Sequence, residues 1–350
     1  MLKHPELEIN MTKKIAQNEI IKRRYFEFLK HADGKADSTI KMVGASIRRY
    51  ETFTKFKDFK TFDRNKAIEF KDELYDLVSL ASVLTTTNHL KRFFAWLAQQ
   101  NGYKRSIHLP DIAFFNLTDR DKRIANAPSD KEFPSLAMVK KVVEQMPTTT
   151  AIEKRNRALM AFTALTMIRV SALASLKLKH IDLKNGLIKQ NPREVKTKNR
   201  KAIYSHILPF CDEFEDIIQK WIIFLQEELL FAPTDPLFPK TALEHDENAC
   251  YVPQCLLREH WQSTAPIRRI FKEAFENAGL PVYTPHRFRD MMEAELTKID
   301  PSFAEYKALS QSFGHKSVMT TVTSYGKLSV MEQGRLIRES LKKRFDEANI

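Results

Sequence analysis

The feature that most constrains the fold is a helical spacing of apolar residues over the first hundred positions. In three stretches apolar side chains recur at steps of three and four residues, which places them on one face of an α-helix. Ser38 is a favourable helix N-cap before the first stretch, and Asn101-Gly102 is a stop signal after the third. The sequence therefore predicts a flexible terminus at 1–14 and a helical bundle over 15–105. The apolar stripes are Ile40, Val43, Ile47, Tyr50 and Phe53, then Ala67, Phe70, Leu74 and Leu77, then Leu90, Phe93, Phe94 and Leu97.

A second domain is predicted from the change of pattern after residue 105. Prolines at 110, 128 and 134 punctuate a stretch without periodicity, which is typical of a linker over 106–134. From Ser135 onward a long apolar helix, Ala151–Met167, precedes a hairpin signal at Asn185-Gly186 and a returning strand at Ala202–Leu208. Residues 232–264 are expected to be an irregular insertion. The predicted class is mainly α with a small β-hairpin or sheet (α+β), with a domain over 135–328 and a last helix over 329–350.

The charge of the chain favours a polyanionic partner. The 350 residues carry a formal net charge of +13, and only 8 are Gly, which argues against a glycine-rich phosphate loop. Lys and Arg outnumber Asp and Glu by 13 to 6 over residues 11–60, and by 6 to 1 over residues 186–209. A solvated surface is the alternative for either stretch taken alone. In the second stretch the charges flank apolar residues at β spacing, which favours a ribbon laid on a phosphate backbone.

The cysteines predict neither a disulfide framework nor a metal site. There are three, and their spacing around Cys250 and Cys255, with His245 and His260 nearby, does not fit the common zinc fingers. Free thiols are the favoured interpretation, and we expect no metal and no cofactor. No apolar run has membrane-spanning length and no signal-peptide pattern begins the chain, so we expect a soluble protein of the cytoplasm, in the bacterial cytoplasm or nucleoid.

The residues with the clearest chemistry lie near the C-terminus. His286-x-x-Arg289 is followed by Gly314-His315 and then by Tyr325, while Arg169 stands far upstream after the apolar helix. Arginines fork onto the non-bridging oxygens of a phosphodiester, histidines donate and accept protons, and tyrosine can act as the nucleophile. Together they form a set suited to attack a phosphodiester without metal. Single surface arginines, buried histidines and a buried tyrosine are the structural alternatives.

The order and spacing of these residues resemble the tyrosine recombinase (phage integrase) family over roughly residues 135–330. The resemblance implies a SAM-like core-binding domain at the N-terminus and an integrase-type catalytic domain. It implies Tyr325 as the nucleophile that forms a 3′-phosphotyrosyl bond, with Arg169 and Arg289 on the phosphate. It also implies His286 and His315 for proton transfer and phosphate binding. A lysine on a β-hairpin protonates the leaving 5′ oxygen in this family. Here Lys196 is favoured and Lys198 is the alternative.

Four positions depart from the family pattern. Ala172 stands where an acidic residue is frequent, so that structural support is missing or is supplied elsewhere. Asp290 follows Arg289 where histidine is common, and Phe313 replaces the usual leucine before Gly-His. Tyr325 lies ten residues after His315, one more than the commonest spacing. None of these departures removes a catalytic group.

The resemblance implies a DNA strand-exchange enzyme that works without metal or ATP. Its expected partners are double-stranded DNA, further copies of the chain in a tetramer on two sites, and an accessory DNA-bending protein. The reaction would integrate, excise or transpose a mobile element. Two alternatives stay open, a type IB topoisomerase-like enzyme that relaxes DNA and a catalytically silent DNA-binding protein of the same fold.

Overall fold

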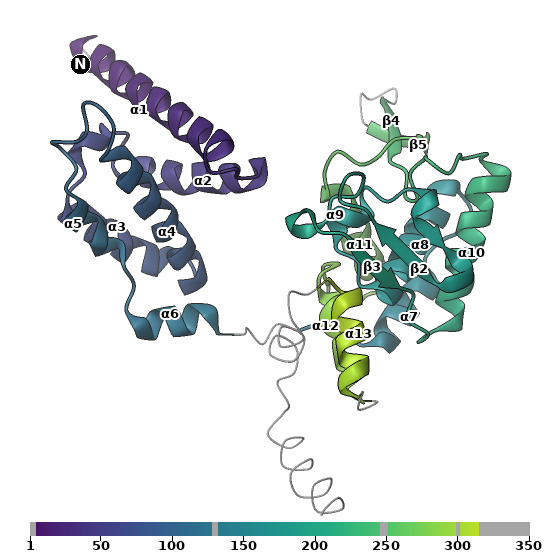
Figure 1. Ribbon diagram of the computed structural model, residues 1–350. Coiled ribbons are helices and arrows are strands. Elements are labelled where there is room, and N and C mark those ends of the chain that lie inside the picture. Colours follow the sequence, from purple (N-terminus) through teal and green to yellow (C-terminus); the bar gives the residue numbers. More distant parts are fainter. Residues whose placement is uncertain (1–4, 128–131, 246–250, 299–301, 315–350) are drawn as a thin grey trace, which may run out of the picture. The chain divides into compact units, whose positions relative to one another are not determined.

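Apolar side chains collect in two separate hydrophobic cores. The computed structural model describes residues 5–127, 132–245, 251–298 and 302–314, and the chain divides into two units, Met1–Ser129 and Asp130–Ile350 (Figure 1). The predicted C-terminal helix over 329–350 lies outside the described residues. Within the described part, no helix has the length and apolar character needed to cross a membrane.

The first unit is a bundle of helices around aromatic side chains. The predicted stripes face inward, with Ile47, Phe70 and Phe94 fully buried, whereas Leu77 at the end of its helix is 65% exposed. The rings of Phe62 and Phe94 stack with centroids 4.0 Å apart. The elements are α1 (Pro5–His31), α2 (Asp37–Phe53), η1 (Phe59–Thr61), α3 (Arg64–Leu77), α4 (Leu80–Leu97), α5 (Leu109–Ile112), η2 (Ala113–Phe115) and α6 (Asp119–Asn126).

The structure differs from the predicted linker over 106–134. Residues as far as Asn126 form α5, η2 and α6, and the side chains of Ile112, Phe115 and Leu117 are buried in the core of the first unit. Pro110 lies in the first turn of α5, where a missing N–H costs no helical hydrogen bond. The hydroxyl of Thr118 caps α6 by accepting from the backbone N–H of Asp121. Proline therefore begins a helix here and does not mark a linker.

The second unit is built around one buried helix, α8 (Ala151–Thr166). Every residue from Ala158 to Thr166 is buried, and a capping box between Thr150 and Glu153 fixes the start of the helix. The other helices of this unit pack around α8 and the small sheet (Figure 1). They are α7 (Leu136–Gln145), α9 (Val170–Leu173), α10 (Asp212–Ile223), which runs into the π-turn η6 (Phe224–Glu228), α11 (Ala265–Asn277), α12 (Arg287–Lys298) and α13 (Phe303–Ser312).

A three-stranded antiparallel sheet in the order β1-β2-β3 carries the predicted hairpin. Its strands are β1 (Ile181–Asp182), β2 (Leu187–Gln190) and β3 (Ile203–His206), with short turns η3 (Leu178–His180), η4 (Leu183–Asn185) and η5 (Lys198–Arg200). Gly186 has a φ of 57°, a left-handed conformation that suits glycine at this turn. Ile181 pairs with Ile188 and Leu187 with His206. The turn at Asn185-Gly186 and the returning strand are both confirmed.

A second hairpin lies in the region that we expected to be irregular. Strands β4 (Thr241–His245) and β5 (Tyr251–Leu256) pair in antiparallel fashion. Arg155 of α8 anchors the start of this hairpin, because its guanidinium donates to the carbonyl oxygen of Pro239 and, at 3.0 Å, to the hydroxyl of Thr241. The Arg155 guanidinium also lies over the ring of Trp261, 4.7 Å from its centroid. The start of this hairpin is therefore held by contacts with a distant helix.

Candidate active site

Two arginines predicted to bind phosphate, Arg169 and Arg289, meet at one carbonyl oxygen. The backbone oxygen of Phe313 accepts from Nη1 of Arg169 at 3.3 Å and from Nη2 of Arg289 at 3.1 Å. A second bond runs from Nη1 of Arg289 to the carbonyl oxygen of Met167, two residues before Arg169. The fold thus brings together guanidinium groups that lie 120 residues apart in the chain, next to Gly314.

The end of α8 sets the position of Arg169. Met167, the C-cap of α8, has a φ of 54°, which is rare for a residue with a side chain. The chain turns away there, and Arg169 follows in an extended conformation before α9 begins at Val170. Because Met167 is fully buried, the surrounding core holds this turn. The apolar helix therefore delivers the arginine, as the sequence predicts, and the turn also aims the Met167 carbonyl at Arg289.

Arg289 is fixed by the packing of α12. Its side chain is only 2% exposed, and its neighbours Phe288, Met291 and Met292 are fully buried. Phe288 packs edge-on against Phe271 of α11, with ring centroids 5.0 Å apart. A buried guanidinium needs acceptors, and the two carbonyl oxygens described above supply them. This arginine is therefore held in place before any ligand binds.

The junction between β3 and α13 requires a glycine next to the arginines. A Cβ on Gly314 would lie 2.6 Å from Cδ1 of Ile203 and 3.4 Å from Nη1 of Arg169, and the φ of this residue is 65°. Two hydrogen bonds also tie the strand to the helix end, from the Ser205 hydroxyl to the Ser312 carbonyl oxygen at 2.6 Å and from the His206 N–H to the Ser312 hydroxyl at 3.0 Å. Ser205 and Ser312 could not be singled out from the sequence, because lone serines carry no pattern.

His286 precedes α12, and its backbone oxygen accepts from the N–H of Arg289 at 3.1 Å. The residue is exposed to solvent, but partial desolvation of the ring by nearby protein lowers the pKa of His286. Asp290 opposes this shift, whereas the charges of Arg289, Arg287 and Arg169 lower the pKa further. His286 therefore lies within the electrostatic field of Arg169 and Arg289, which we call the clamp arginines, and it favours its neutral form.

Asp290, a departure from the family pattern, has an ion-pair partner on its own helix. Its carboxylate lies 2.5 Å from the guanidinium of Arg287, three residues earlier. The pair spans one turn of α12, where residues three apart lie on the same face. This carboxylate thus helps to order the first turn of the helix that carries Arg289.

Lys196 and Lys198 both lie on the connection between β2 and β3, and both are exposed. The backbone N–H of Lys196 donates to the Ser175 hydroxyl at 2.9 Å, and the preceding Val195 is 2% exposed. Lys198 begins the turn η5, in which Asn199 and Arg200 have φ values of 59° and 51°. Lys196 therefore follows directly after an anchored segment, whereas Lys198 lies in the turn itself.

Glu293 is a buried carboxyl group that the sequence analysis did not identify. It lies four residues after Arg289 on α12 and is 3% exposed, and within the described residues neither of its oxygens has a hydrogen-bond partner. Burial raises the pKa of Glu293 to about 9, although the charge of Arg289 acts in the opposite direction. Burial therefore favours the neutral form of this carboxyl, which leaves the positive charge of the arginine pair intact.

Two of the predicted catalytic residues, His315 and Tyr325, lie outside the described residues. In the described ranges there is no group of three or more His, Cys, Asp or Glu side chains that could hold a metal ion.

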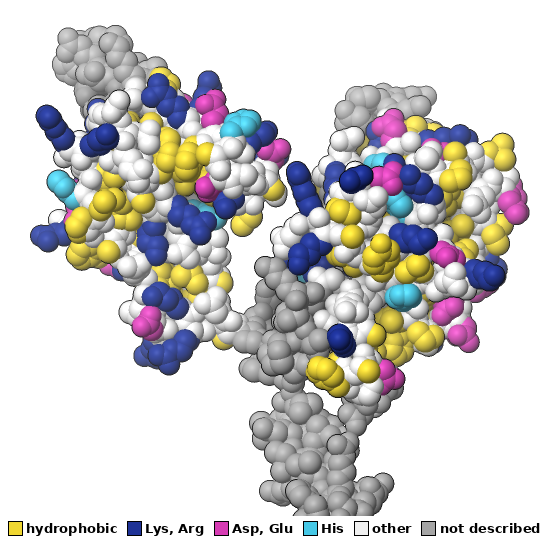
Figure 2. Space-filling model, in the orientation of Figure 1, with side chains coloured by type: hydrophobic (Ala, Val, Ile, Leu, Met, Phe, Trp, Pro, Cys, Tyr) yellow, Lys and Arg dark blue, Asp and Glu magenta, His cyan; other side chains and the backbone are white. Residues whose placement is uncertain are grey.

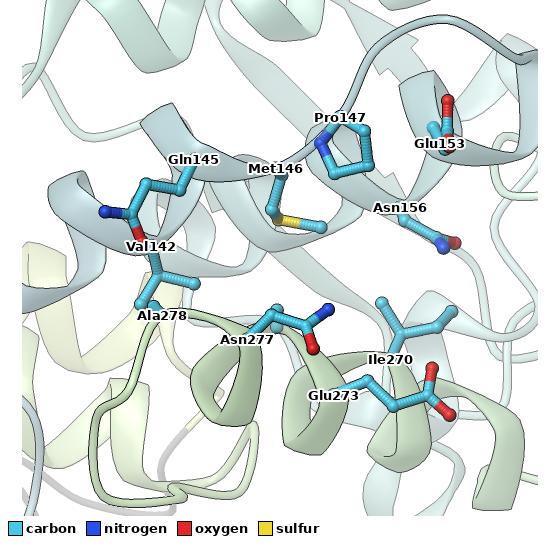
Figure 3. Close-up of a pocket in the computed structure, with 11 residues that line it drawn as sticks. Val142, Gln145, Met146, Pro147, Glu153, Asn156, Ile270, Glu273, Asn277 and Ala278 are labelled. Atoms are coloured by element: carbon cyan, nitrogen blue, oxygen red, sulfur yellow. The ribbon is translucent and has the colours of Figure 1, made fainter.

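A pocket of about 130 Å³ between α7, the start of α8 and α11 is lined by residues such as Gln145, Glu273 and Asn277 (Figure 3). Neither clamp arginine lines this pocket, so it is separate from the candidate site.

Comparison with known proteins finds similar sequences over most of the chain. A sequence model of the Phage integrase family matches residues 137–331. The tyrosine recombinase XerD of Oceanobacillus iheyensis is 22% identical over 305 residues, covering 85% of this chain and 90% of that protein.

Two solved structures share the fold. The XerH site-specific recombinase bound to palindromic difH substrate has a TM-score of 0.61 at 19% identity, over 90% of this chain and 82% of that chain. A lambda integrase dimer bound to a COC′ core site has a TM-score of 0.59 at 16% identity, over 93% of this chain and 83% of that chain. The α+β architecture is thus that of a DNA recombinase fold.

Proposed function

The chain belongs to the phage integrase family of DNA strand-transferring enzymes, and on that premise we propose that it cuts duplex DNA at a specific site and rejoins the strands through Tyr325. The convergence of Arg169 and Arg289 on the Phe313 carbonyl oxygen carries this proposal. Two guanidinium groups that share one small acceptor are spaced to share a phosphate as well. A phosphodiester bound there would receive charge-assisted bonds to both non-bridging oxygens, where charge grows during cleavage.

In the proposed reaction the Tyr325 oxygen attacks phosphorus and the bond from phosphorus to the 5′ oxygen breaks. Tyrosine has an ordinary pKa of about 10, so a cationic surrounding favours the attacking phenolate. His286 and His315 take the phenolic proton and hold the phosphate, and Lys196 gives a proton to the departing 5′ oxygen. The 3′-phosphotyrosyl ester is close in energy to the bond broken. A 5′ hydroxyl of a second strand therefore reverses the step without metal or ATP.

The proposed substrate is double-stranded DNA held by both units. Lysine and arginine side chains are spread over the visible faces of both units (Figure 2). In the first unit a groove of about 380 Å³ lies between α2 and α4, and its lining combines Arg49 and His89 with the small side chains of Ser82 and Thr85. Polar side chains of this kind donate to phosphates and base edges. We assign this groove to DNA contact.

The relatives support a further part of the proposal, the assembly. XerH and lambda integrase were solved on DNA, the latter as a dimer. We propose a homo-oligomer, a tetramer when two sites are brought together, with an accessory DNA-bending protein. The natural reaction would be the integration, excision or transposition of a mobile element, in the bacterial cytoplasm or nucleoid. Formation of recombinant products from two separate sites, as opposed to relaxation of one supercoiled plasmid, distinguishes this from topoisomerase-like activity.

The test of the arginine clamp uses a nicked suicide duplex that traps covalent protein–DNA complexes. The DNA site is first selected from a random library by binding. Arg169→Lys and Arg289→Lys keep the charge but lose the planar fork, so each should lower the rate of adduct formation by about 100-fold or more while binding falls far less. Arg269→Lys is the matched control, because its exposed guanidinium pairs with Glu273 on α11. If Arg289→Lys forms the adduct as fast as the control, the clamp is wrongly assigned.

A further inference from the structure

Glu194, two residues before Lys196, is the acceptor for three cationic or titratable side chains. Its Oε1 lies 3.0 Å from Nζ of Lys177 and 2.7 Å from Nζ of Lys179, and its Oε2 lies 3.2 Å from Nε2 of His180. All three partners belong to one short segment, 177–180, at the turn η3. Bonds from Lys179, Lys177 and His180, in that order of size, lower the pKa of Glu194 to about 2. Both oxygens of the Glu194 carboxylate are thus bonded to one segment, residues 177–180, which we call the platform.

The segment 177–180 is itself anchored to the body of the second unit. The N–H groups of Leu178 and Lys179 donate to the carbonyl oxygens of Asp235 and Pro233, at 3.1 and 2.8 Å. The Leu178 side chain is 5% exposed and belongs to the core. These bonds come from the start of the 232–264 region, which we expected to be an irregular insertion. Part of that region therefore supports the platform under Glu194.

The tautomer of His180 follows from its hydrogen bonds. The backbone N–H of Lys177 donates to Nδ1 of His180 at 3.1 Å, so Nδ1 is the acceptor nitrogen of the ring. The proton of the neutral ring must then be on Nε2, which donates to Glu194. His180 is 4% exposed, and burial lowers its pKa while Glu194 raises it. The net effect is a lowered pKa, and it is the neutral ring that accepts from Lys177 and donates to Glu194.

The chain between Glu194 and Lys196 leaves little freedom for the lysine backbone. The N–H groups of Glu194 and Val195 both donate to the carbonyl oxygen of Asn191, at 3.0 and 2.8 Å. The Val195 side chain is buried, and the N–H of Lys196 donates to the Ser175 hydroxyl. The backbone is therefore held by hydrogen bonds as far as the N–H of Lys196, and the exposed connection to β3 follows.

We propose that Glu194 is a positioning residue for Lys196. Through its bonds to Lys177, Lys179 and His180, Glu194 fixes the direction in which the side chain of Lys196 leaves the backbone. This inference rests on the proposed function, in which Lys196 protonates the leaving 5′ oxygen. A proton donor works only within hydrogen-bond reach of its acceptor, so a shift of about 1 Å in the lysine is costly. Glu194 itself does not touch the DNA or the reacting atoms in this role.

The test compares cleavage of two suicide substrates, one with the natural 5′ oxygen and one with a 5′-bridging sulfur. Sulfur is a good leaving group and needs no proton, so it removes the requirement for Lys196. On the oxygen substrate Glu194→Ala should lose roughly 10- to 100-fold in rate, and Lys196→Ala at least as much. On the sulfur substrate both variants should return to within about threefold of the wild-type rate. The double variant should be no slower than Lys196→Ala, because both changes remove one function.

The controls separate positioning from folding. Glu259→Ala removes an exposed carboxylate that pairs with Lys240, and it should leave both rates unchanged. Glu194→Gln keeps the shape of the side chain and replaces Glu194→Ala if the latter does not fold, with DNA affinity and the melting temperature measured in parallel. Glu194 variants that are equally slow on both substrates would overturn the positioning role while leaving Lys196 assigned.

Two other outcomes bear on the proposed function. If Lys196→Ala is not rescued by sulfur, Lys196 is not the proton donor, and the role of Glu194 fails together with that assignment. If Lys198→Ala is rescued in its place, the donor is Lys198. If the wild-type chain forms no adduct on either substrate, the recombinase function itself is refuted.

Discussion

Replacing Glu293 with glutamine should change how the stability of the second unit depends on pH. The folded protein keeps a proton on this buried carboxyl up to a pKa of about 9, whereas the ordinary value is 4.5. Between these two values the unfolded state binds fewer protons than the folded state, so this group makes stability fall as pH rises. Its full contribution is present below about pH 4.5 and is lost once the pH exceeds about 9.

The size of the effect follows from the shift. Because the two states differ by nearly one bound proton throughout this window, the wild-type chain should lose on the order of 3 kcal/mol through this one group between pH 6 and pH 8. Glutamine cannot ionise and has nearly the same shape. Other titrating groups are common to both proteins and cancel in the comparison. The Glu293→Gln chain should therefore gain about that amount relative to wild type over the same two units.

Urea unfolding at pH 6 and pH 8 measures this difference, with tryptophan fluorescence as the probe. Trp221 and Trp261 are buried in the second unit, where their indole N–H groups donate to the carbonyl oxygens of Leu237 and Phe238. Trp96 belongs to the first unit, so a Trp96→Phe background makes the signal specific. Glu295→Gln, which removes a carboxylate paired with Lys298 on the same helix, is the control. Parallel pH curves for wild type and Glu293→Gln would refute the buried neutral carboxyl.

Three further predictions concern the site and the substrate. Gly314→Ala should slow adduct formation more than Gly279→Ala does, because both glycines have a φ of about 65° but only a Cβ at 314 meets Ile203 and Arg169; equal effects would show that backbone strain alone is responsible. Cleavage should continue in EDTA, since guanidinium groups form the clamp, and a loss of cleavage that magnesium restores would contradict this. A chain that begins at Ser135 should bind DNA more weakly than the whole chain, and its binding constant should depend less steeply on salt concentration. Titrations at several salt concentrations measure both, and equal affinities and slopes would show that the first unit contributes no phosphate contacts.

The sequence was sufficient for the features that repeat or cluster along the chain. The spacing of Ile47, Phe70 and Phe94 predicted their helices because amphipathic periodicity is local, and Asn185-Gly186 predicted its turn because only a few residue pairs adopt that backbone. Arg169 became a candidate because it follows an apolar helix and resembles a family arginine, and its role stays a prediction. Each of these signals lies within a short window of the sequence.

The features that the sequence did not predict depend on distant contacts. Pro110 suggested a linker, yet burial of Ile112 and Phe115 against the first bundle makes helices of that stretch. The start of the hairpin β4–β5 is bonded to Arg155, which lies on the distant helix α8. In the sequence Glu293 is one of several charged residues in a helix, and its burial is visible only in the folded structure. The acceptor between the clamp arginines is a backbone oxygen, which no residue type encodes.

The measurement that tests the central claim most directly is the identity of the residue joined to DNA. The wild-type chain is trapped on a suicide duplex, digested with protease and nuclease, and the peptide that carries a nucleotide is sequenced by mass spectrometry. The proposed function predicts a phosphotyrosyl link at Tyr325 to the 3′ end of the cut strand, and no adduct with Tyr325→Phe, while Tyr204→Phe at an exposed tyrosine of β3 retains it. An adduct at any other residue, or one that persists in Tyr325→Phe, would contradict the mechanism.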